Sequence, residues 1–245
     1  SREGLFFRLV EALIEVHSCG FMGREVPIPP LARLVAEIED QGYSYARDKG
    51  LFVEAAGRDK TMGWGTLREG RTYELALLRM DVVGNSTLVR RYPGEAVRAT
   101  FAAVKEMARR QVERRDGRIW SWEGDGGLAA FYFGEKSLQA TLCAIEILHE
   151  LALFNLLGCR LPEPVGMRLA VHAGPCRFTG SPRDAGGETI RRVELLESRY
   201  TQTDSLTVSQ VVYTDLGGKL ERSFTAIGGD GNGALFRYAL CWDKA

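Results

Sequence analysis

The sequence is organised around one apolar stretch that ends on a carboxylate, LALLRMDVVGNS (residues 75–86). An apolar run of this length, followed at once by Gly, Asn and Ser, is typical of a central β-strand that ends in a turn. This strand would carry Asp81 to the edge of a sheet. The turn leads into a helix, and the free backbone N–H groups at a helix start favour a bound phosphate. Residues 85–88 are therefore expected to contact phosphate.

A second carboxylate lies at the tip of a predicted hairpin. Residues 118–123 and 128–133 have the composition of strands, and the glycine-rich turn between them carries Asp125. If this hairpin pairs with the first strand, Asp81 and Asp125 face one another. Two close carboxylates repel unless cations lie between them, and oxygen ligands suit Mg²⁺ or Mn²⁺. Together the two motifs indicate phosphoryl chemistry on a nucleotide.

Composition excludes several classes of protein. A chain of 245 residues, 45% of them hydrophobic, can bury the core of one domain with an extension. The 32 basic and 32 acidic residues balance, so no net charge favours nucleic acid or a membrane surface. No apolar stretch reaches the ~20 residues of a membrane span and no secretion signal is visible, which predicts a cytoplasmic protein. The five cysteines form no C-x-x-C pair and are expected to be reduced, mostly buried thiols.

The order of the predicted elements defines the fold class. The strand that ends near Asp81 is followed by a helix over 95–114, the hairpin, a helix over 138–157 and a strand over 167–173. Strand, helix, strand, strand, helix, strand is the split βαββαβ pattern of a ferredoxin-like α+β domain.

Further elements are predicted on both sides of this core. After it we expect a helix over 189–199 and extra strands over 206–213, 223–227 and 234–240. Before it we expect helices over 2–17 and 31–38, then loops with one small hairpin between 42 and 71. The early helices are amphipathic, so they would pack on the following domain or on a second subunit.

Three motifs in this order resemble the class III nucleotidyl cyclase catalytic domain. They are Asp-x-x-Gly-x-Ser at 81–86, EGDGGLAAF at 123–131 and RLAVHAGP at 168–175. The resemblance covers residues 72–241. It implies a cyclase domain over 72–245, preceded by an extension over 1–71.

The resemblance also implies roles for the residues of the site. Two divalent metal ions, Mn²⁺ or Mg²⁺, would be held by Asp81, Val82 and Asp125. One ion would lower the pKa of the ribose 3′-hydroxyl and the other would grip the triphosphate. Main-chain N–H groups would bind the phosphates at Val82, Val83, Gly84, Asn85 and Ser86. The simpler alternatives are that Asp81 caps the next helix and that Gly84 is a plain turn glycine.

The residue at the base-selecting position differs from that of the family's purine cyclases. These carry Lys or Glu four residues before the second aspartate, and this chain has Ser121 there. Trp120 and Trp122 flank Ser121, and strand alternation predicts that both point into the core, away from Ser121. Asp184 is the match to the family's second base contact. His172 lies inside an apolar strand and is expected to be a core histidine with its hydrogen bonds satisfied.

Two further departures concern catalysis. The family's Asn and Arg, which orient the ribose and steady the transition state, correspond to Arg191 and Leu195 here. Arg191, Arg192 or Arg199 could supply the charge, with Arg192 and Arg199 as the catalytic candidates and Arg191 as a substrate contact. Surface ion pairs with neighbouring glutamates are the alternative for all three. The family's late phosphate-binding Lys has no clear counterpart in the glycine-rich loop at 229–233.

These departures resemble the bacterial uridylate and cytidylate cyclases of the Pycsar anti-phage system. That branch implies a soluble homodimer with shared active sites, which converts UTP to cyclic UMP as a second messenger, and UTP is favoured over CTP. One alternative is an ATP or GTP cyclase with a rewired base pocket. The other is a degenerate cyclase-like domain that binds nucleotide and signals through dimerisation.

Overall fold

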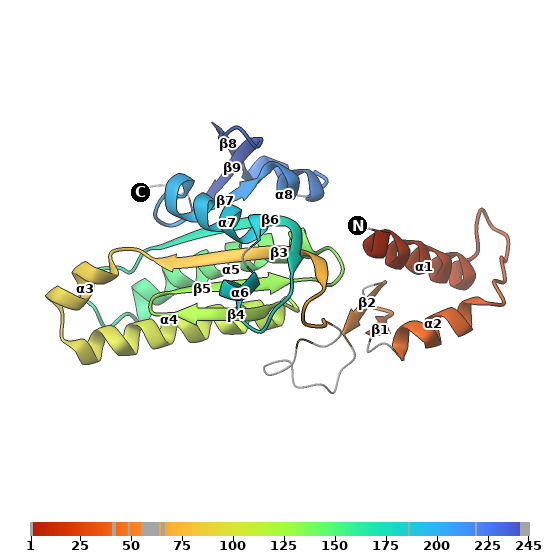
Figure 1. Cartoon of the computed structure of the whole chain (residues 1–245), viewed down its shortest axis with the longest axis horizontal. Coiled ribbons are helices and arrows are strands. Elements are labelled where there is room, and N and C mark those ends of the chain that lie inside the picture. Colours follow the sequence, from red (N-terminus) through yellow and green to blue (C-terminus); the bar gives the residue numbers. More distant parts are fainter. Residues whose placement is uncertain are drawn as a thin grey trace. The chain divides into compact units, whose positions relative to one another are not determined.

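The computed structural model describes residues 2–40, 43–48, 50–54, 64, 67–185, 187–218 and 220–240. Contacts along the chain divide it into two compact units, Ser1–Arg68 and Glu69–Ala245. Figure 1 labels the helices and strands of both units.

The described residues of the first unit form two helices and a hairpin, as the sequence predicts. Its elements are α1 (Arg2–Cys19), α2 (Leu31–Glu39), β1 (Tyr43–Ala46) and β2 (Leu51–Glu54). The two strands pair in antiparallel fashion. The core of the unit is small and its buried residues are Val10, Leu31, Ile38 and Phe52. Most of the loop that follows the hairpin, from 55 to 66, lies outside the described residues.

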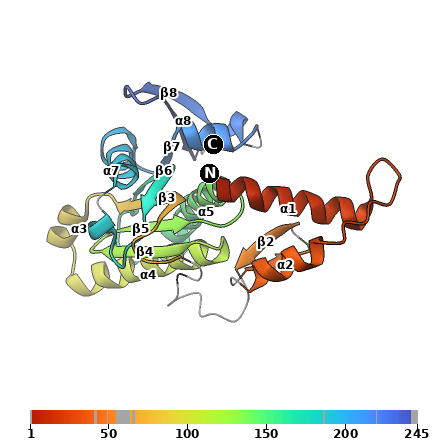
Figure 2. The ribbon, with the colours of Figure 1, turned by 45° about the vertical axis from the view of Figure 1, so that its right-hand side comes forward.

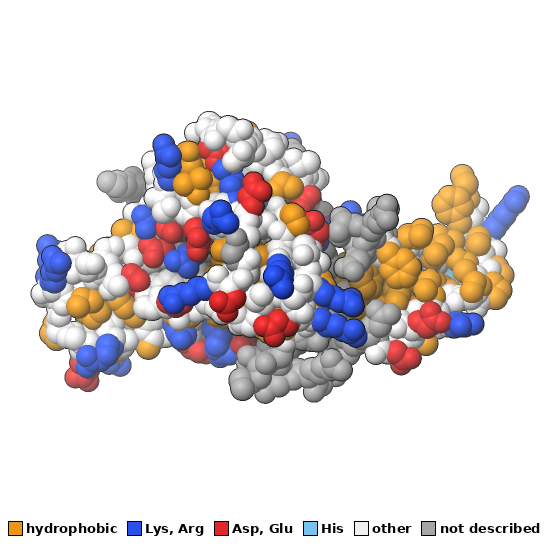
Figure 3. Space-filling model, viewed as in Figure 1, with side chains coloured by type: hydrophobic (Ala, Val, Ile, Leu, Met, Phe, Trp, Pro, Cys, Tyr) orange, Lys and Arg blue, Asp and Glu red, His pale blue; other side chains and the backbone are white. Residues whose placement is uncertain are grey.

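Large apolar side chains remain exposed on the first unit. They are Phe6, Leu9, Phe21 and Met22, and Met22 is 88% exposed. Figure 3 shows hydrophobic side chains gathered on this unit. The four side chains contribute little to the unit's own core.

The second unit is built on one seven-stranded sheet with the order β4-β5-β3-β6-β7-β9-β8. Its strands are β3 (Thr72–Val82), β4 (Arg118–Glu123), β5 (Gly126–Phe131), β6 (Met167–Arg177), β7 (Ser205–Ser209), β8 (Thr225–Gly229) and β9 (Ala234–Ala239). Only the β6–β7 pair is parallel. With α4 (Gly94–Arg114) and α5 (Lys136–Leu157), the order β3-α4-β4-β5-α5-β6 confirms the predicted α+β core with extra carboxy-terminal strands.

The central strand β3 is long and buried on both faces. It pairs with β6 from Thr72 to Val82 and with β5 from Ala76 to Asp81, and Figure 2 shows it between these neighbours. Its even-numbered residues from Ala76 to Val82 pack into the main core with α4 and α5. The odd-numbered Leu75 and Leu77 are also buried. A strand covered on both faces reads as a continuous apolar run, which explains the sequence of this segment.

Helix α5 is a core helix, although by length and composition it could cross a membrane. Its mean hydropathy reaches 1.6 over 18 residues. Ile147, Leu148 and Leu151 are buried and belong to the main core. Leu156 and Leu157, near its end, are exposed.

The predicted strand over 206–213 is wrong in its second half. β7 ends at Ser209 and a short helix, α8 (Gln210–Asp215), begins at once. The β-branched pair Val211 and Val212 favours a strand locally. However, Val212 and Leu216 are buried in the main core four residues apart, while Val211 is exposed, and this spacing is that of a helix face. The predicted strand at 223–227 begins later, at Thr225, because a 3₁₀ turn (Glu221–Ser223) precedes it.

The helix predicted over 189–199 is present as two joined pieces. These are α7 (Glu188–Leu195) and one π-helical turn (Leu196–Tyr200). Two short helices complete the unit, α3 (Asn85–Arg91) and α6 (Pro182–Ala185).

The cysteines agree in part with the expectation of buried thiols. Cys143 and Cys176 are buried and free, and burial raises the pKa of Cys176 to about 11. Cys159 is half-buried. Cys19 is exposed, because it lies at the end of α1. Cys241 lies outside the described residues.

Candidate active site

The turn after β3 and the turn between β4 and β5 meet at one edge of the sheet. Asp81 pairs with Gly126 in the β3–β5 register. The Val82 N–H donates a hydrogen bond to the Asp125 carbonyl oxygen, with an N···O distance of 3.3 Å. Backbone pairing therefore brings together the two segments that carry Asp81 and Asp125. The role of these aspartates as metal ligands stays a prediction.

Gly126 lies against the Asp81 carboxylate and leaves no room for a side chain. A Cβ on Gly126 would lie 3.3 Å from Asp81 Oδ1 and 2.9 Å from the Met80 carbonyl oxygen. Sequence reasoning gave Gly126 no role of its own. The sequence feature that could have identified Gly126 is its position directly after Asp125, where a glycine allows the two turns to approach closely.

The turn that follows β3 depends on Gly84, whose φ of 75° is left-handed and favours glycine. Its carbonyl accepts hydrogen bonds from the N–H groups of Thr87 and Leu88, which starts α3. The Val83 N–H donates to the Gly166 carbonyl (2.9 Å), as the Val82 N–H does to Asp125. Both N–H groups are therefore engaged by protein carbonyls in this structure, and their role as amide donors to phosphate stays a prediction.

The amide donors left to the predicted phosphate site are those of Gly84, Asn85 and Ser86. In the described part of the chain, no backbone carbonyl accepts a hydrogen bond from their N–H groups. Gly84 and Ser86 are exposed and Asn85 is half-buried. Their role in phosphate binding stays a prediction.

The oxygen atoms at this edge fit a hard divalent cation. Besides the two carboxylates, Asn85 Oδ1 is buried, and no described residue donates a hydrogen bond to it. Among the residues that the structure describes, no three His, Cys, Asp or Glu side chains form a metal cluster. An ion here would depend on Asp81, Asp125, the Val82 carbonyl and the phosphate oxygens of a bound nucleotide, which is how Mg²⁺ is commonly held.

Asp81 takes part in a chain of charges that the sequence analysis did not identify. Its Oδ2 accepts a hydrogen bond from the Arg168 guanidinium at 2.6 Å, and Arg168 Nε lies 2.8 Å from Glu197 Oε1. Burial opposes the charge of Arg168, but the two carboxylates outweigh it and raise the Arg168 pKa. Burial, followed by the charge of Asp81, raises the pKa of Glu197. The available signal was Arg168 itself, the first residue of the third motif, which the register places opposite Asp81.

The residues predicted to select the base lie on β4 and α6, two elements that one ion pair joins. Ser121 is half-buried and Asp184 is exposed. The neighbour of Asp184, Arg183, forms an ion pair with Glu123 at the end of β4. This ion pair ties α6 to the strand that carries Ser121.

The two tryptophans beside Ser121 do not share one face as predicted. A β-bulge in β4 places Trp120 and Ser121 both opposite Leu128, because one extra residue enters the strand. Trp122 packs against the main core. Trp120 is buried elsewhere: it stacks on Phe178, with ring centroids 5.7 Å apart.

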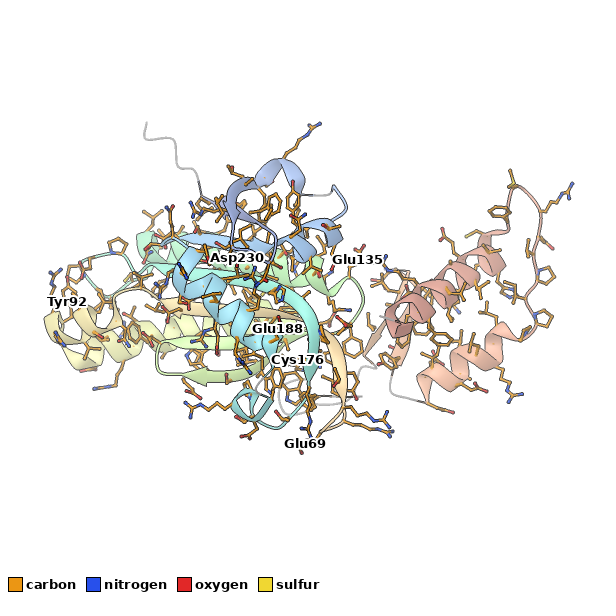
Figure 4. The ribbon with its side chains drawn as sticks, turned by 45° about the horizontal axis from the view of Figure 1, so that its top comes forward. Glu69, Tyr92, Glu135, Cys176, Glu188 and Asp230 are labelled. Atoms are coloured by element: carbon orange, nitrogen blue, oxygen red, sulfur yellow. The ribbon has the colours of Figure 1, made fainter. Side chains whose placement is uncertain are left out.

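Arg192 is engaged in a buried ion pair. Its side chain is 9% exposed and that of its partner Asp230 is 1% exposed. One hydrogen bond between them measures 2.6 Å, and Figure 4 shows Asp230 beside α7. The hydrogen bond to Arg192 lowers the pKa of Asp230. The catalytic role of Arg192 stays a prediction, and in this structure its charge is directed to Asp230.

The other two arginines predicted for the site are exposed. Arg191 lies on the solvent side of α7. The guanidinium of Arg199 lies over the ring of Tyr200, 5.7 Å from its centroid.

His172 is half-buried, and it has the hydrogen-bond partner that was expected of it. Its Nδ1 lies 2.8 Å from Ser209 Oγ. Burial, and then the charge of Arg192, lower its pKa to about 4. The ring is therefore neutral near pH 7, and it lies where Arg192 would repel a proton.

The fold is that of nucleotidyl cyclase domains. An adenylate/guanylate cyclase/hydrolase from Silicibacter pomeroyi is similar with a TM-score of 0.59 and 20% identity, over 70% of this chain and 99% of that one. The adenylyl cyclase CyaB from P. aeruginosa gives 0.59 and 13%, over 71% and 98%. The guanylate cyclase domain of RhGC from Catenaria anguillulae, solved with GTP, gives 0.56 and 15%, over 69% and 96%. No protein-family model and no curated protein matches the sequence.

Proposed function

We propose that the protein is a metal-dependent pyrimidine nucleotidyl cyclase that converts UTP to 3′,5′-cyclic UMP and pyrophosphate. Residues 72–245 would form the catalytic domain of a cytoplasmic homodimer with shared active sites, and residues 1–71 its extension. The product would serve as a second messenger in anti-phage defence. The observation that supports the chemistry is the meeting of the Asp81 and Asp125 segments at one edge of a cyclase-type sheet.

The reaction fits these residues. In it the ribose 3′-oxygen attacks the α-phosphorus, a new P–O bond closes the ring, the bond to the bridging oxygen breaks and pyrophosphate leaves. The 3′-hydroxyl proton passes to water. Divalent ions held by the aspartates would stabilise the negative charge on the 3′-oxygen and on the phosphates. The turn at Gly84 lets the chain approach the phosphates closely, and Gly126 keeps the Asp81 carboxylate accessible.

Ser121 supports the choice of a pyrimidine. Its short hydroxyl can both donate and accept one hydrogen bond, whereas a purine edge is commonly matched by a longer or charged group. Trp120, on the same side of the bulge, is stacked on Phe178 and donates its indole N–H to the Thr179 carbonyl. The Trp120 side chain is therefore held in place by these contacts, and its ring is not free to stack on a base. UTP is favoured over CTP within this proposal.

The test is incubation of the full chain with each nucleoside triphosphate and Mn²⁺, with products separated by chromatography. We expect a cyclic product from UTP. Asp81→Asn and Asp125→Asn should each abolish it while circular dichroism stays unchanged, and Asp48→Asn in the first unit serves as the matched control. Product from ATP or GTP alone would overturn the pyrimidine assignment, and full turnover by either variant would overturn the metal assignment.

A second candidate is a nucleotide-binding module without turnover. One observation favours it: Arg192, a candidate for the transition-state charge, is held by Asp230. Binding of UTP and Mn²⁺ without any cyclic product would select this candidate. Sedimentation of enzymatically active protein as a monomer only would contradict the shared-site dimer.

A further inference from the structure

Arg79 lies on the same side of the sheet as Asp81, at the candidate site. The two residues are two positions apart on β3, so their side chains leave the same face. The Arg79 guanidinium and the Asp81 carboxylate both approach Gly126: a Cβ there would lie 3.4 Å from the terminal nitrogen of Arg79 and 3.3 Å from Asp81 Oδ1. One glycine therefore separates a cation and an anion at the sheet edge.

Arg79 differs from Arg168 in its partners. Arg168 is engaged by Asp81 on one side and by Glu197 on the other. Arg79 Nε is buried, and no described residue accepts a hydrogen bond from it. Its charge acts on Glu197, whose pKa it lowers, although burial prevails and leaves that pKa raised. A buried donor without an acceptor costs about 1–3 kcal/mol, which an incoming acceptor would recover.

We propose that Arg79 is a phosphate-binding residue of the nucleotide site. This inference rests on the proposed function only in taking the ligand to be a nucleoside triphosphate. A guanidinium presents donors in a planar fork that matches two phosphate oxygens, and charged hydrogen bonds of this kind are strong. The metals that the aspartates would hold require phosphate oxygens at the same edge, within reach of Arg79.

The register favours the phosphates over the base as the ligand group. Arg79 pairs with Leu128 on β5, and Leu128 pairs with Ser121 on β4. Neighbouring strands are about 4.8 Å apart, so the backbones of Arg79 and Ser121 are separated by roughly 10 Å. Arg79 thus lies beside Asp81 and away from the residue predicted to select the base.

The test uses the full chain, Mn²⁺ and inorganic tripolyphosphate as the probe, with titration calorimetry as the readout. Tripolyphosphate has no base or ribose and cannot be cyclised, so binding is measured apart from turnover. We expect Arg79→Gln to weaken binding about 10- to 100-fold, as the loss of charged hydrogen bonds implies. Arg237→Gln is the matched control, because Arg237 is also a half-buried strand arginine with an unpartnered Nε, on β9. Its affinity should stay that of the wild type.

A measurement on the wild type keeps the inference testable if Arg79→Gln does not fold. In ¹⁵N NMR spectra the Arg79 Nε–H resonance, assigned by its loss in Arg79→Lys, should shift on addition of tripolyphosphate with Mg²⁺. The Arg237 resonance should not shift.

Unchanged binding by folded Arg79→Gln, an unmoved Arg79 resonance, or no binding by the wild type would each overturn the assignment of Arg79. Failure of the proposed function looks different. In that case no triphosphate yields a cyclic product, yet tripolyphosphate still binds and still depends on Arg79.

Discussion

Breaking the ion pair between Arg192 and Asp230 should destabilise the second unit strongly. The Asp230 side chain is 1% exposed and that of Arg192 is 9% exposed, so water has little access to either charge. Removing one partner of such a pair costs about 3–5 kcal/mol, because the other charge stays buried and unpaired. With a urea m-value of about 2 kcal/mol/M, Asp230→Ala and Arg192→Met should each lower the unfolding midpoint by about 1.5–2.5 M.

The double variant separates the charge from the packing. Arg192→Met combined with Asp230→Ala removes both charges, so no charge stays buried and unpaired. The double variant should therefore lose much less stability than the sum of the two single variants. Urea unfolding followed by circular dichroism measures all three. A midpoint shift below about 0.5 M for Asp230→Ala would refute the reasoning.

The same variants decide what Arg192 does. If its role is structural, Asp230→Ala and Arg192→Met should lose stability alike, and turnover should follow the folded fraction in both. If Arg192 is catalytic, Arg192→Met should abolish turnover in folded protein while folded Asp230→Ala, whose Arg192 is released, keeps it. Activity measured well below the unfolding midpoint distinguishes these outcomes.

Three more results are expected. Gly126→Ala should weaken Mn²⁺ binding and turnover, because the added Cβ would crowd the Asp81 carboxylate. The loss should be at least about tenfold, which corresponds to one charged contact of about 1.5 kcal/mol. Normal Mn²⁺ affinity in calorimetry would contradict this. The His172 pKa is lowered from 6.5 to about 4, so between these pH values the unfolded chain binds the proton more readily than the folded one. The free energy of unfolding should therefore fall as the pH drops from about 6.5 to about 4. An NMR titration of His172 with a midpoint near 6.5 would contradict this prediction. Leu148→Ala in α5 should cost about 2–5 kcal/mol and Leu157→Ser less than about 0.5 kcal/mol in urea unfolding, and equal costs would mean that α5 is not a core helix.

Much of the fold could be predicted because its central elements have strong patterns. The apolar run of β3 and the hairpin around Asp125 each carry their own turn signal, α4 has clear helical spacing, and α5 is a long, strongly apolar segment. The prediction failed where local preference and packing disagree. Val211 and Val212 favour a strand, yet burial of Val212 and Leu216 in the core selects a helix.

The charges around the site could not be predicted from the sequence. Arg192 and Asp230 are 38 residues apart, and Arg168 and Asp81 are 87 apart. Each pair is formed by strand register and helix packing, which a list of residue types does not specify. The bulge at Trp120 is a second case, since one extra residue in β4 changes which side chains share a face.

The charge balance at the sheet edge explains why a nucleotide and its metals would bind together. The carboxylates of Asp81, Asp125 and Glu197 exceed the guanidiniums of Arg79 and Arg168 by one negative charge, so the edge alone has little attraction for a polyanion. Two divalent cations would reverse the sign of the edge and make it complementary to a triphosphate. Arg168 can release Asp81 to a cation without losing all its partners, because Glu197 stays within 2.8 Å of its Nε. Arg79, whose Nε has no acceptor among the described residues, would gain one when phosphate binds. The arrangement of the two arginines thus suits a site that is completed by metal and nucleotide in one step.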